Sequence, residues 1–344
     1  MPIERRVLLQ SAGRIGLGAA LAMPAIRRAN AAPRVLKISH QFPGGSIDQG
    51  DFRDRLARIF ARDVTKETNG ELEFQVYAGS SLMKTLAQFS ALRRGALDLS
   101  VYPLPYAGGE VPEVNITLMP MMVTSYAQGT TWKTAPIGRA IEKLCEDKGI
   151  KILTWVWQAG AIGSRLSPIV IPDEVKGQKI RGGSREFDLF LKAAGGIISS
   201  APSNETYAAM QTGSLDATVT SSTSLTSFRI YEIAKHVTTA QGGSIWFIFT
   251  PLLMSKMVFE SLTPDQQKAV EKVGAAIEPF AVGESKKDDA ELAEVFRKAG
   301  AGVHQHTPQT LAAWQPIAEA SAWADFEKRS ASTAALMKLA RDAM

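Results

Sequence analysis

Short apolar strands and amphipathic helices alternate after the N-terminal segment. Residues 35–40 alternate apolar and polar positions, as a strand with one buried face does. Apolar residues at helical spacing predict helices over 49–68 and 81–94, and strands are expected at 72–77 and 97–102. The order strand, helix, strand, helix, strand is typical of a parallel sheet covered by helices.

The same alternation returns in the middle of the chain. A strand is expected at 178–180, and Arg181 stands between its end and a Gly-Gly loop. A helix and a second strand at 197–199 follow. A helix from about 204 to 213 then leads to a strand at 215–219, which runs into Thr and Ser residues. Ligands of open α/β sheets bind at strand ends. One end here carries a guanidinium and another carries hydroxyls, which predicts a pocket for a small anion.

Residues 91–101 and 209–219 repeat one pattern. Both read Ala, an apolar residue, two variable residues, Gly, a small residue, Leu, Asp and then a strand. Each copy closes a strand–helix–strand–helix–strand unit, so two similar α/β lobes are the simplest interpretation. The alternative is a coincidence between two common helix–glycine–strand junctions.

The remaining segments connect these two lobes. A helix over 126–148 and a strand over 151–157 follow a Pro-rich loop, and the apolar stretch 245–254 suits a strand that crosses back to the first lobe. A helix from Thr263 to about 298 carries Pro279 as a kink. A last strand is expected at 302–306, followed by C-terminal helices. The predicted boundaries are 33–157 and 247–285 for lobe I, and 158–246 and 286–344 for lobe II.

The N-terminal segment has the features of an export signal. Arg5 and Arg6 form a twin-arginine signature, an apolar run covers 15–26, and a small-x-small cleavage site covers 29–31. The run is short for a bilayer span, although a retained membrane anchor is the alternative interpretation. We expect residues 1–31 to be a twin-arginine signal peptide and the mature chain to be soluble and periplasmic.

Charge and cysteine usage narrow the function classes. The chain has 39 Lys and Arg against 34 Asp and Glu, for a net charge of +5, and removing the leader leaves 34 against 33. A nearly neutral mature chain argues against a nucleic-acid partner.

Cys145 is the sole cysteine, which excludes an internal disulfide and a Cys metal cluster, and its helical stripe suits a buried thiol. His304 and His306 alternate on a strand, but a solvated pair is the preferred interpretation over a metal site. No cofactor or metal is therefore expected.

The chain resembles the substrate-binding proteins of tripartite ATP-independent periplasmic (TRAP) transporters over essentially its whole mature length. The most specific segments are Gly-Gln-Lys-Ile-Arg at 177–181, the run at 204–217 and Tyr-Glu-Ile-Ala-Lys-His-Val at 231–237, with support from 262–267 and 95–98. The resemblance implies an α/β, two-lobe, periplasmic-binding-protein-like fold of class II type. Each lobe would be a mostly parallel sheet flanked by helices, and hinge strands and a long lobe-spanning helix would join them. Such proteins close around an organic acid and deliver it to a membrane permease.

The resemblance also implies a role for Arg181, the arginine that pairs with the ligand carboxylate in this family. An arginine fork matches a carboxylate in two charge-assisted hydrogen bonds. The alternative is a surface ion pair of little energetic weight. Arg165 departs from the family pattern, since Ser167 precedes Pro168 where a second basic residue is common. It is expected either to bind a second carboxylate or to pair with an acidic neighbour at 173–174.

The hydroxyl run departs from the family pattern as well. Many members carry a Gln-Glu-Asn or Trp-containing run where this chain has Ala-Thr-Val-Thr-Ser-Ser-Thr-Ser at 217–224, so the ligand cannot be transferred from relatives. We expect Ser221, Ser222 and Thr223 to donate hydrogen bonds to the ligand, with Thr220 behind them. A helix N-cap cluster without ligand contact is the alternative.

Aromatic residues and two strand-end residues complete the predicted site. Trp157 and Trp246, together with Trp155 and Phe247, are candidates for an aromatic wall, and core packing is the alternative for each. Gln41 and Tyr102 lie beyond strand ends of the first lobe and are expected to line the cleft from that side.

The predicted function is a periplasmic solute-binding protein that captures a small organic acid by hinge closure and passes it to a TRAP permease. A monocarboxylate, aromatic or of the 2-oxo or 2-hydroxy type, is preferred because one arginine is well placed. A dicarboxylate is the alternative ligand. A periplasmic ligand sensor and an exported α/β enzyme are the alternative functions, although no Gly-x-Ser-x-Gly, Gly-x-Gly-x-x-Gly or P-loop motif is present.

Overall fold

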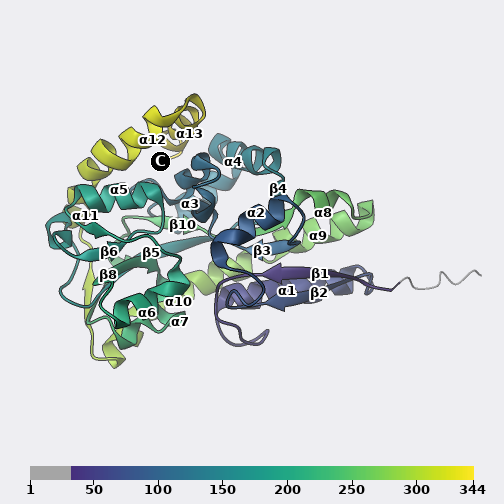
Figure 1. Ribbon diagram of the computed structural model, residues 1–344, viewed down its shortest axis with the longest axis horizontal. Coiled ribbons are helices and arrows are strands. Elements are labelled where there is room, and N and C mark those ends of the chain that lie inside the picture. The colour runs from purple at the N-terminus through teal and green to yellow at the C-terminus, as the bar shows by residue number, and fades with distance from the viewer. Residues whose placement is uncertain (1–31) are drawn as a thin grey trace, which may run out of the picture. The chain divides into compact units, whose positions relative to one another are not determined.

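The computed structural model describes residues 32–344, which form two β-sheets flanked by helices (Figure 1). The predicted signal peptide lies outside the described residues. The five-stranded sheet has the order β2 (Leu72–Tyr77), β1 (Arg34–Ser39), β3 (Leu99–Val101), β11 (Leu252–Ser255) and β4 (Ile150–Thr154). The seven-stranded sheet has the order β12 (Gly302–Gln305), β9 (His236–Thr239), β5 (Trp157–Ser164), β8 (Ala217–Ser221), β6 (Lys179–Arg181) and β7 (Ile197–Ile198), and β10 (Phe247–Phe249) pairs with β5.

The two sheets share one topology at their centres. β1 lies between β2 and β3 and is parallel to both, and β6 lies between β7 and β8 in the same way. An antiparallel strand adjoins the third strand in each case, β11 beside β3 and β5 beside β8. The repeated sequence pattern therefore corresponds to a repeated arrangement of strands.

The repeat extends to individual hydrogen bonds. Asp98 Oδ2 accepts from the Lys37 backbone N–H at 2.7 Å, and Asp216 Oδ2 accepts from the Lys179 backbone N–H at 2.9 Å. Each aspartate thus ties the start of one strand to its parallel neighbour. Gly95, three residues before Asp98, has a φ of 67°, which glycine adopts without steric cost at a helix end.

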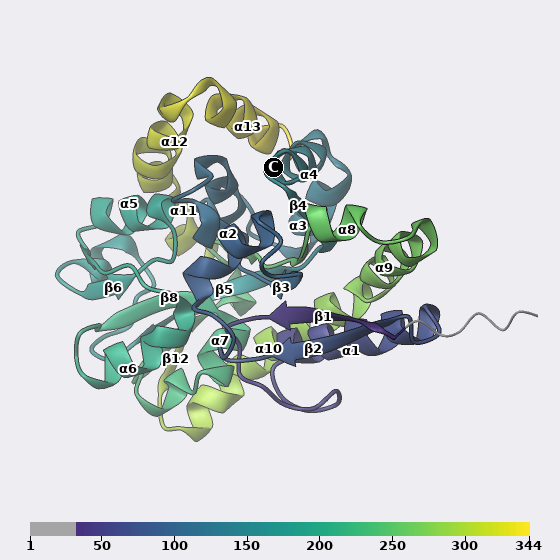
Figure 2. The ribbon, with the colours of Figure 1, turned by 45° about the vertical axis from the view of Figure 1, so that its right-hand side comes forward.

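Helices cover both sheets. Those near the five-stranded sheet include α1 (Phe52–Glu67), α2 (Gln88–Arg93), α8 (Lys256–Glu260) and α9 (Pro264–Ala276). Those near the seven-stranded sheet include α5 (Arg185–Ala193), α6 (Thr206–Gln211), α7 (Ser222–Ser227) and α11 (Pro308–Ala318). The C-terminal helices α12 (Ala324–Arg329) and α13 (Ala331–Arg341) follow a π-helical turn, and α13 lies beside α4 (Pro136–Asp147), as Figure 2 shows.

Three chain segments connect the sheets. The chain leaves the five-stranded sheet after β4 and enters the other with β5, so Trp155 and Val156 form the first crossing. It returns at Thr250–Pro251, between β10 and β11. The third connection is the long helix α10 (Glu278–Lys298), which contacts α1 as well as α7 and β9. The lobe boundaries proposed from sequence remain a prediction, and these crossings lie within a few residues of them.

Several predicted elements are divided in the structure. The helix expected over 126–148 is α3 (Tyr126–Thr134) and α4, because Pro136 lacks an N–H and Ala135 is extended. The helix expected up to 298 ends at Ala276, and α10 begins anew with Pro279 in its first turn. The strand expected over 151–157 ends at Thr154. The glycine-containing strand β5 was not predicted.

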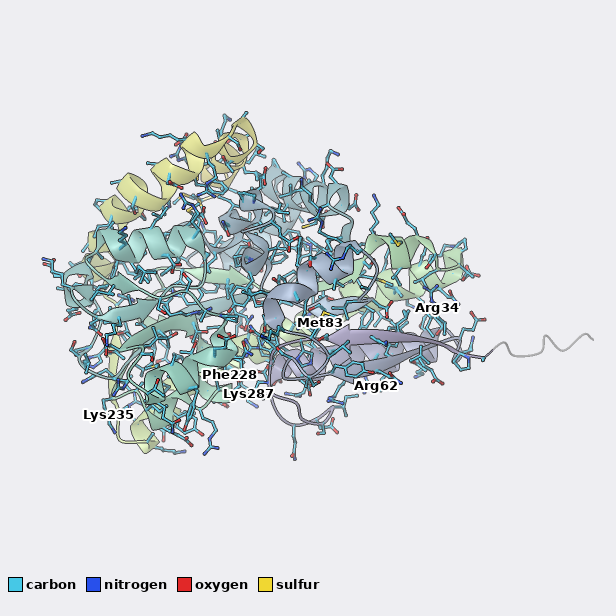
Figure 3. The ribbon with its side chains drawn as sticks, in the orientation of Figure 1. Arg34, Arg62, Met83, Phe228, Lys235 and Lys287 are labelled. Carbon is cyan, nitrogen blue, oxygen red and sulfur yellow. The ribbon has the colours of Figure 1, made fainter. Side chains whose placement is uncertain are left out.

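Hydrophobic side chains fill the interior on both sides of each sheet, and charged side chains such as Arg62, Lys235 and Lys287 extend outward (Figure 3). Cys145 is buried in this core, as expected. Within residues 32–344, no helix is long and apolar enough to cross a membrane.

Candidate functional site

A small cavity with about 10 Å³ of free space lies where strand ends of both sheets meet. Residues that follow β1 and β3 line one side, together with the start of α1, and residues from β5, β6, β8 and β10 line the other. The lining residues are Gln41, Phe42, Arg53, Pro103, Tyr106, Leu118, Gln158, Arg181, Gly182, Ser203, Thr220, Ser221, Ser224, Trp246, Ile248 and Thr250.

Arg181 ends β6 and lines this cavity with 3% of its surface exposed. Its guanidinium donates to three neutral oxygens: Nε to Ala201 O at 2.8 Å, Nη1 to Val219 O at 2.6 Å and Nη2 to Tyr106 Oη at 2.7 Å. None of its hydrogen bonds within the described chain is to a carboxylate. One N–H on each Nη atom is left over from these bonds. A buried cation without a counter-ion is costly, and an anion in the cavity would offset that cost.

Glycines keep room for this guanidinium. Gly183 has a φ of +93°, and a Cβ on it would lie 2.9 Å from Arg181 Nη2. Both the backbone conformation and the space therefore require glycine at this position. The space that the Arg181 guanidinium needs is a physical reason for the Gly-Gly loop that follows Arg181 in the sequence.

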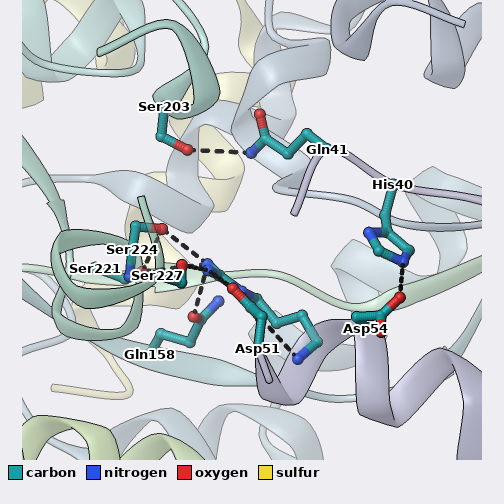
Figure 4. Close-up of polar contacts among 10 residues, drawn as sticks. His40, Gln41, Asp51, Asp54, Gln158, Ser203, Ser221, Ser224 and Ser227 are labelled. Atoms are coloured by element: carbon teal, nitrogen blue, oxygen red, sulfur yellow. Dashed lines mark hydrogen bonds and ion pairs between the residues drawn. The ribbon is translucent and has the colours of Figure 1, made fainter. Parts of the chain in front are cut away.

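Arg53 is a second arginine of the cavity, and sequence analysis did not find it. It lies in the first turn of α1, is 2% exposed and forms two hydrogen bonds with Asp51, at 2.8 and 2.6 Å. Its Nη1 donates to Ser224 Oγ at 2.9 Å and to Gln158 Oε1 at 3.3 Å (Figure 4). Phe42 stacks under the guanidinium at 3.7 Å. Arg53 therefore links α1 with α7 and β5, and Asp51 neutralises its charge.

Tyr106 was also missed. It follows β3 in the 3₁₀ turn Leu104–Ala107 and accepts hydrogen bonds from Arg181 Nη2 and from the Ser203 backbone N–H at 3.0 Å. Burial by itself favours the neutral phenol, but the Arg181 charge and hydrogen bonds from Ser203 and Gln41 outweigh it and lower the pKa of Tyr106. The hydroxyl thus joins the two sides of the cavity.

The predicted hydroxyl residues divide into two groups. Thr220 and Ser221 line the cavity, and Ser221 also caps α7 by accepting from the Ser224 backbone N–H, so both interpretations apply to it. Ser222 and Thr223 do not line it. Their side chains bond instead to acids of α10, Ser222 to Asp289 at 2.7 Å and Thr223 to Asp288. The helical turn that starts at Ser222 rotates these two side chains away, which corrects the sequence-based assignment.

The surroundings of two acidic residues of α10, Asp288 and Asp289, shift their pKa values. Burial raises the pKa of Asp288 to about 6, in spite of the Thr223 hydrogen bond and the Arg53 charge, and the nearby Asp51 and Glu284 charges raise it further. Burial also raises the pKa of Asp289. The contact between α7 and α10 is therefore sensitive to protonation.

Three further polar side chains of the cavity have an atom without a partner among the described residues. These are Gln158 Nε2, Trp246 Nε1 and Thr250 Oγ1. Two of them are N–H donors, and the third is a hydroxyl. Buried polar groups are normally paired, so the cavity offers hydrogen bonds to a bound molecule.

Trp246 and Gln41 occupy the cavity wall, where sequence analysis expected them. The Trp246 ring lies against Gly160, where a Cβ would come within 1.8 Å of it, and only glycine leaves this space. Gln41 Nε2 donates to Ser203 Oγ at 3.2 Å across the cavity (Figure 4). Both residues come from the predicted sides of the cleft.

Other predicted residues lie elsewhere. Arg165 follows the far end of β5 and contacts Asp216 at 3.9 Å, at the opposite end of β8 from Ser221. Tyr102 is fully buried against Phe89 and Tyr106 and does not line the cavity. Trp157 lines a separate hinge cavity. These three predicted residues therefore do not line this cavity.

The hinge cavity lies between α3, the β4–β5 crossing and α10. Trp155 and Trp157 both line it and both contact Phe249, at ring distances of 4.6 and 5.1 Å. The sequence predicted that these two side chains point to the same face of a strand, which agrees with this arrangement. The cavity that they line is at the hinge. Phe247 packs on Tyr126 near the same hinge.

His304 in β12 and His306 just after it do not form a metal cluster with other described residues. His304 Nε2 lies 3.3 Å from His236 Nδ1, and His306 is buried, which lowers its pKa to about 4. Within residues 32–344, no group of three or more His, Cys, Asp or Glu side chains is arranged to hold a metal.

Comparisons with known proteins place this geometry in a family. Residues 49–329 match the profile described as bacterial extracellular solute-binding protein, family 7. A solute-binding protein of Albidiferax ferrireducens is 52% identical over 342 residues, which cover 99% of this chain and 100% of the relative. The chain belongs to family 7. As a family 7 member it is a solute-binding protein of the TRAP type, as the sequence motifs predicted.

Solved structures confirm the two-lobe α/β fold of this family 7 protein. A TRAP periplasmic solute-binding protein of Rhodoferax ferrireducens, solved with bound malonate, is 53% identical with a TM-score of 0.88 and covers 90% of this chain and 98% of its own. A C4-dicarboxylate-binding periplasmic protein of Rhodobacter capsulatus is 26% identical over 92% of each chain. A Sulfitobacter TRAP protein with bound galacturonate has a TM-score of 0.82 at 23% identity, and covers 90% of this chain and all of its own, which shows the fold alone.

Proposed function

We propose that this protein is the periplasmic receptor for a small organic acid whose carboxylate binds Arg181. The observation that carries the proposal is the state of that guanidinium, which is buried and hydrogen-bonded only to neutral oxygens of the described residues. The leftover N–H groups on Nη1 and Nη2 match the two oxygens of a carboxylate in a fork geometry.

The charges of the cavity favour a ligand with one dominant negative charge. Arg53 is neutralised by Asp51, whereas Arg181 has no ion pair within the described residues, although the Asp188 carboxyl interacts with its charge through space. The amide of Gln158, the indole N–H of Trp246 and the hydroxyl of Thr250 suit neutral oxygens on the rest of the molecule. A short 2-oxo or 2-hydroxy acid meets both requirements.

A dicarboxylate is the second candidate. The Rhodoferax ferrireducens relative, 53% identical, was solved with malonate, a three-carbon dicarboxylate. Arg53 lines the same cavity as Arg181 and would face a second carboxylate if ligand binding loosened its hydrogen bonds to the serines. The two candidates differ in whether the second acidic group of the ligand contributes to affinity.

We infer that binding and closure are coupled. Arg53, Gln41 and Tyr106 come from the side of the five-stranded sheet and bond to Ser224, Ser203 and Arg181 on the other side. Such contacts form only when the lobes approach. The closed receptor would then deliver its ligand to a TRAP permease, with export of the chain by the twin-arginine route and no catalytic step.

Calorimetry on the mature protein tests the role of Arg181. Arg181→Ala is expected to weaken binding of the best acid by at least about tenfold, because charge-assisted hydrogen bonds contribute about 1.5–3 kcal/mol each. Arg181→Lys is expected not to restore it, since lysine lacks the planar fork. Arg165→Ala is the matched control and should bind as the wild type does. Unchanged affinity in Arg181→Ala would refute the proposal.

The ligand class is tested by comparing malonate and succinate with pyruvate and lactate on the same protein. A preferred monocarboxylate supports the first candidate, and tighter binding of malonate that is lost at low pH supports the second. Recovery of each acid unchanged after incubation distinguishes a receptor from an enzyme.

A further inference from the structure

A second, larger cavity adjoins the acid-binding cavity. It measures about 280 Å³, and its lining includes Leu86, Tyr106, Asn115, Asp188 and Ser200. We call it the outer chamber. Tyr106 lines both cavities and stands between them.

The side chain of Asn115 is the unusual feature of the outer chamber. It is 1% exposed, and neither its Nδ2 nor its Oδ1 has a hydrogen-bond partner among the described residues. A Cβ on Gly108 would lie 1.9 Å from Asn115 Oδ1, so glycine at that position leaves the space for the amide. Burying an amide whose polar atoms have no partner is costly. A molecule in the chamber that pairs with it removes this cost.

Asp188 adds an acceptor. Its Oδ2 accepts from Ser200 Oγ, whereas its Oδ1 has no partner among the described residues. Burial raises the pKa of Asp188, although the Ser200 hydrogen bond and the Arg181 charge oppose the shift. A carboxyl group here disfavours a second anion and favours a ligand that donates hydrogen bonds.

A hydrogen bond between Arg181 and Tyr106 separates the outer chamber from the acid-binding cavity. Arg181 Nη2 donates to Tyr106 Oη at 2.7 Å, and Gly183 lies directly against the same guanidinium nitrogen. Arg181 lines the inner cavity, while Gly183 lines the outer chamber. A ligand in one cavity therefore does not need to enter the other.

We propose that the outer chamber is a second binding site, for a small neutral molecule that carries hydroxyl or primary amide groups. The Asn115 amide donates and accepts one hydrogen bond each with such a group, and Asp188 Oδ1 accepts another. Leu86, together with Pro105 and Pro202, supplies an apolar surface for the carbon skeleton. This chemistry differs from that of the acid on Arg181.

Occupancy of the outer chamber is linked to closure. Leu86 lies in the turn before α2, on the side of the five-stranded sheet, whereas Asp188 and Ser200 come from the other side, so a molecule held between them contacts both. A ligand that binds one arrangement better shifts the protein toward it. The neutral molecule then raises the affinity for the acid, and by reciprocity the acid raises the affinity for it.

Crystals of the mature protein soaked in acetamide, and separately in glycerol, test the site. We expect density for the probe within hydrogen-bond distance of Asn115 and Asp188. The proposal is overturned if saturating amounts of both probes leave only water in the chamber, or if a probe appears there with no contact to Asn115.

Binding of the same probes to Asn115→Leu provides a second readout. Leucine keeps the shape of asparagine and removes its polar atoms, so the melting temperature is expected to stay level or rise. The acetamide-dependent rise in melting temperature should fall at least fivefold, while binding of the organic acid to Arg181 stays unchanged. Asp188→Asn provides a second variant, with a smaller expected loss. An undiminished acetamide response in both variants would contradict the proposal and would leave the acid site unaffected.

Discussion

At the scale of single residues, two neighbouring tyrosines show how position decides whether a hydroxyl reaches the cavity. Tyr102 and Tyr106 lie four positions apart after β3, and they have opposite roles. Tyr102 is buried in the core with a hydroxyl that has no partner among the described residues, whereas the Tyr106 hydroxyl accepts two hydrogen bonds at the cavity. Since these bonds end on its oxygen, the Tyr106 hydroxyl hydrogen is free to point at an acceptor on a ligand.

We predict that Tyr106→Phe weakens binding of the organic acid about tenfold. The change leaves one N–H of Arg181 and the Ser203 backbone N–H unpaired in a buried site, which costs about 1–3 kcal/mol. Calorimetry and thermal unfolding measure the two effects. Tyr102→Phe is the matched control and should leave affinity unchanged, because its hydroxyl has no hydrogen bond to lose within the described chain. Equal behaviour of the two variants would contradict the assignment.

The sequence revealed Arg181 but not Arg53, and the reason is physical. Arg181 ends a short strand and precedes two glycines, a pattern that exposes a side chain at a sheet edge. Arg53 stands in the first turn of an amphipathic helix, where arginine is ordinarily solvated. The available signal was Asp51 two residues earlier, which caps α1 and pairs with Arg53, but the pairing depends on the fold around it. Ser222 and Thr223 were misassigned because a strand that continues as a helix rotates consecutive side chains differently.

At the level of elements, the contact between α7 and α10 joins the hydroxyl run to the lobe-spanning helix. Thr223 and Ser222 of α7 bond to Asp288 and Asp289 of α10. The pKa of Asp288 is about 6, well above the ordinary value of 3.8, so the folded chain holds this proton more tightly than the unfolded chain does. The associated stability is complete below pH 3.8 and is lost as the pH rises through about 6.

Asp288→Asn is therefore expected to raise the melting temperature by a few degrees at pH 7.5 and to have little effect at pH 3.5. The amide removes the buried charge and keeps a partner for Thr223. Thermal unfolding at both pH values measures the difference. Asp173→Asn is the control, because its side chain is 77% exposed and it should show no pH-dependent gain. A gain for Asp288→Asn that is the same at both pH values would argue against charge burial as the cause.

At the scale of the whole molecule, the repeated strand order and the three connections build two similar lobes around one cavity. The parallel order β2-β1-β3 recurs as β7-β6-β8. The sequence predicted two similar lobes, because the Gly-x-Leu-Asp junction precedes each third strand, but not this order. The sequence did not predict β5, because its small residues do not form a strand pattern. They are required by close packing in the fold: Gly160 makes room for Trp246, a residue distant in sequence.

Arg53 is expected to govern closure of the whole molecule. The double variant Asp51→Asn with Arg53→Gln removes the buried ion pair without leaving one charge alone, and it breaks the bond to Ser224. We predict a larger radius of gyration without ligand in small-angle X-ray scattering and an acid affinity at least fivefold weaker. Arg62→Ala, an exposed position on the same helix, is the control. An unchanged radius together with unchanged affinity would show that Arg53 does not hold the lobes together.

The placement of Trp246 has an optical consequence. Its indole lines the acid-binding cavity, while Trp155 and Trp157 line the hinge cavity, so the two places that change during capture each contain a natural fluorophore. A ligand carboxyl group beside Trp246 alters its emission directly, and movement of the hinge alters the emission of the other two. Fluorescence lifetimes resolved in time after mixing would therefore separate the arrival of the acid from the motion that encloses it, without any added label.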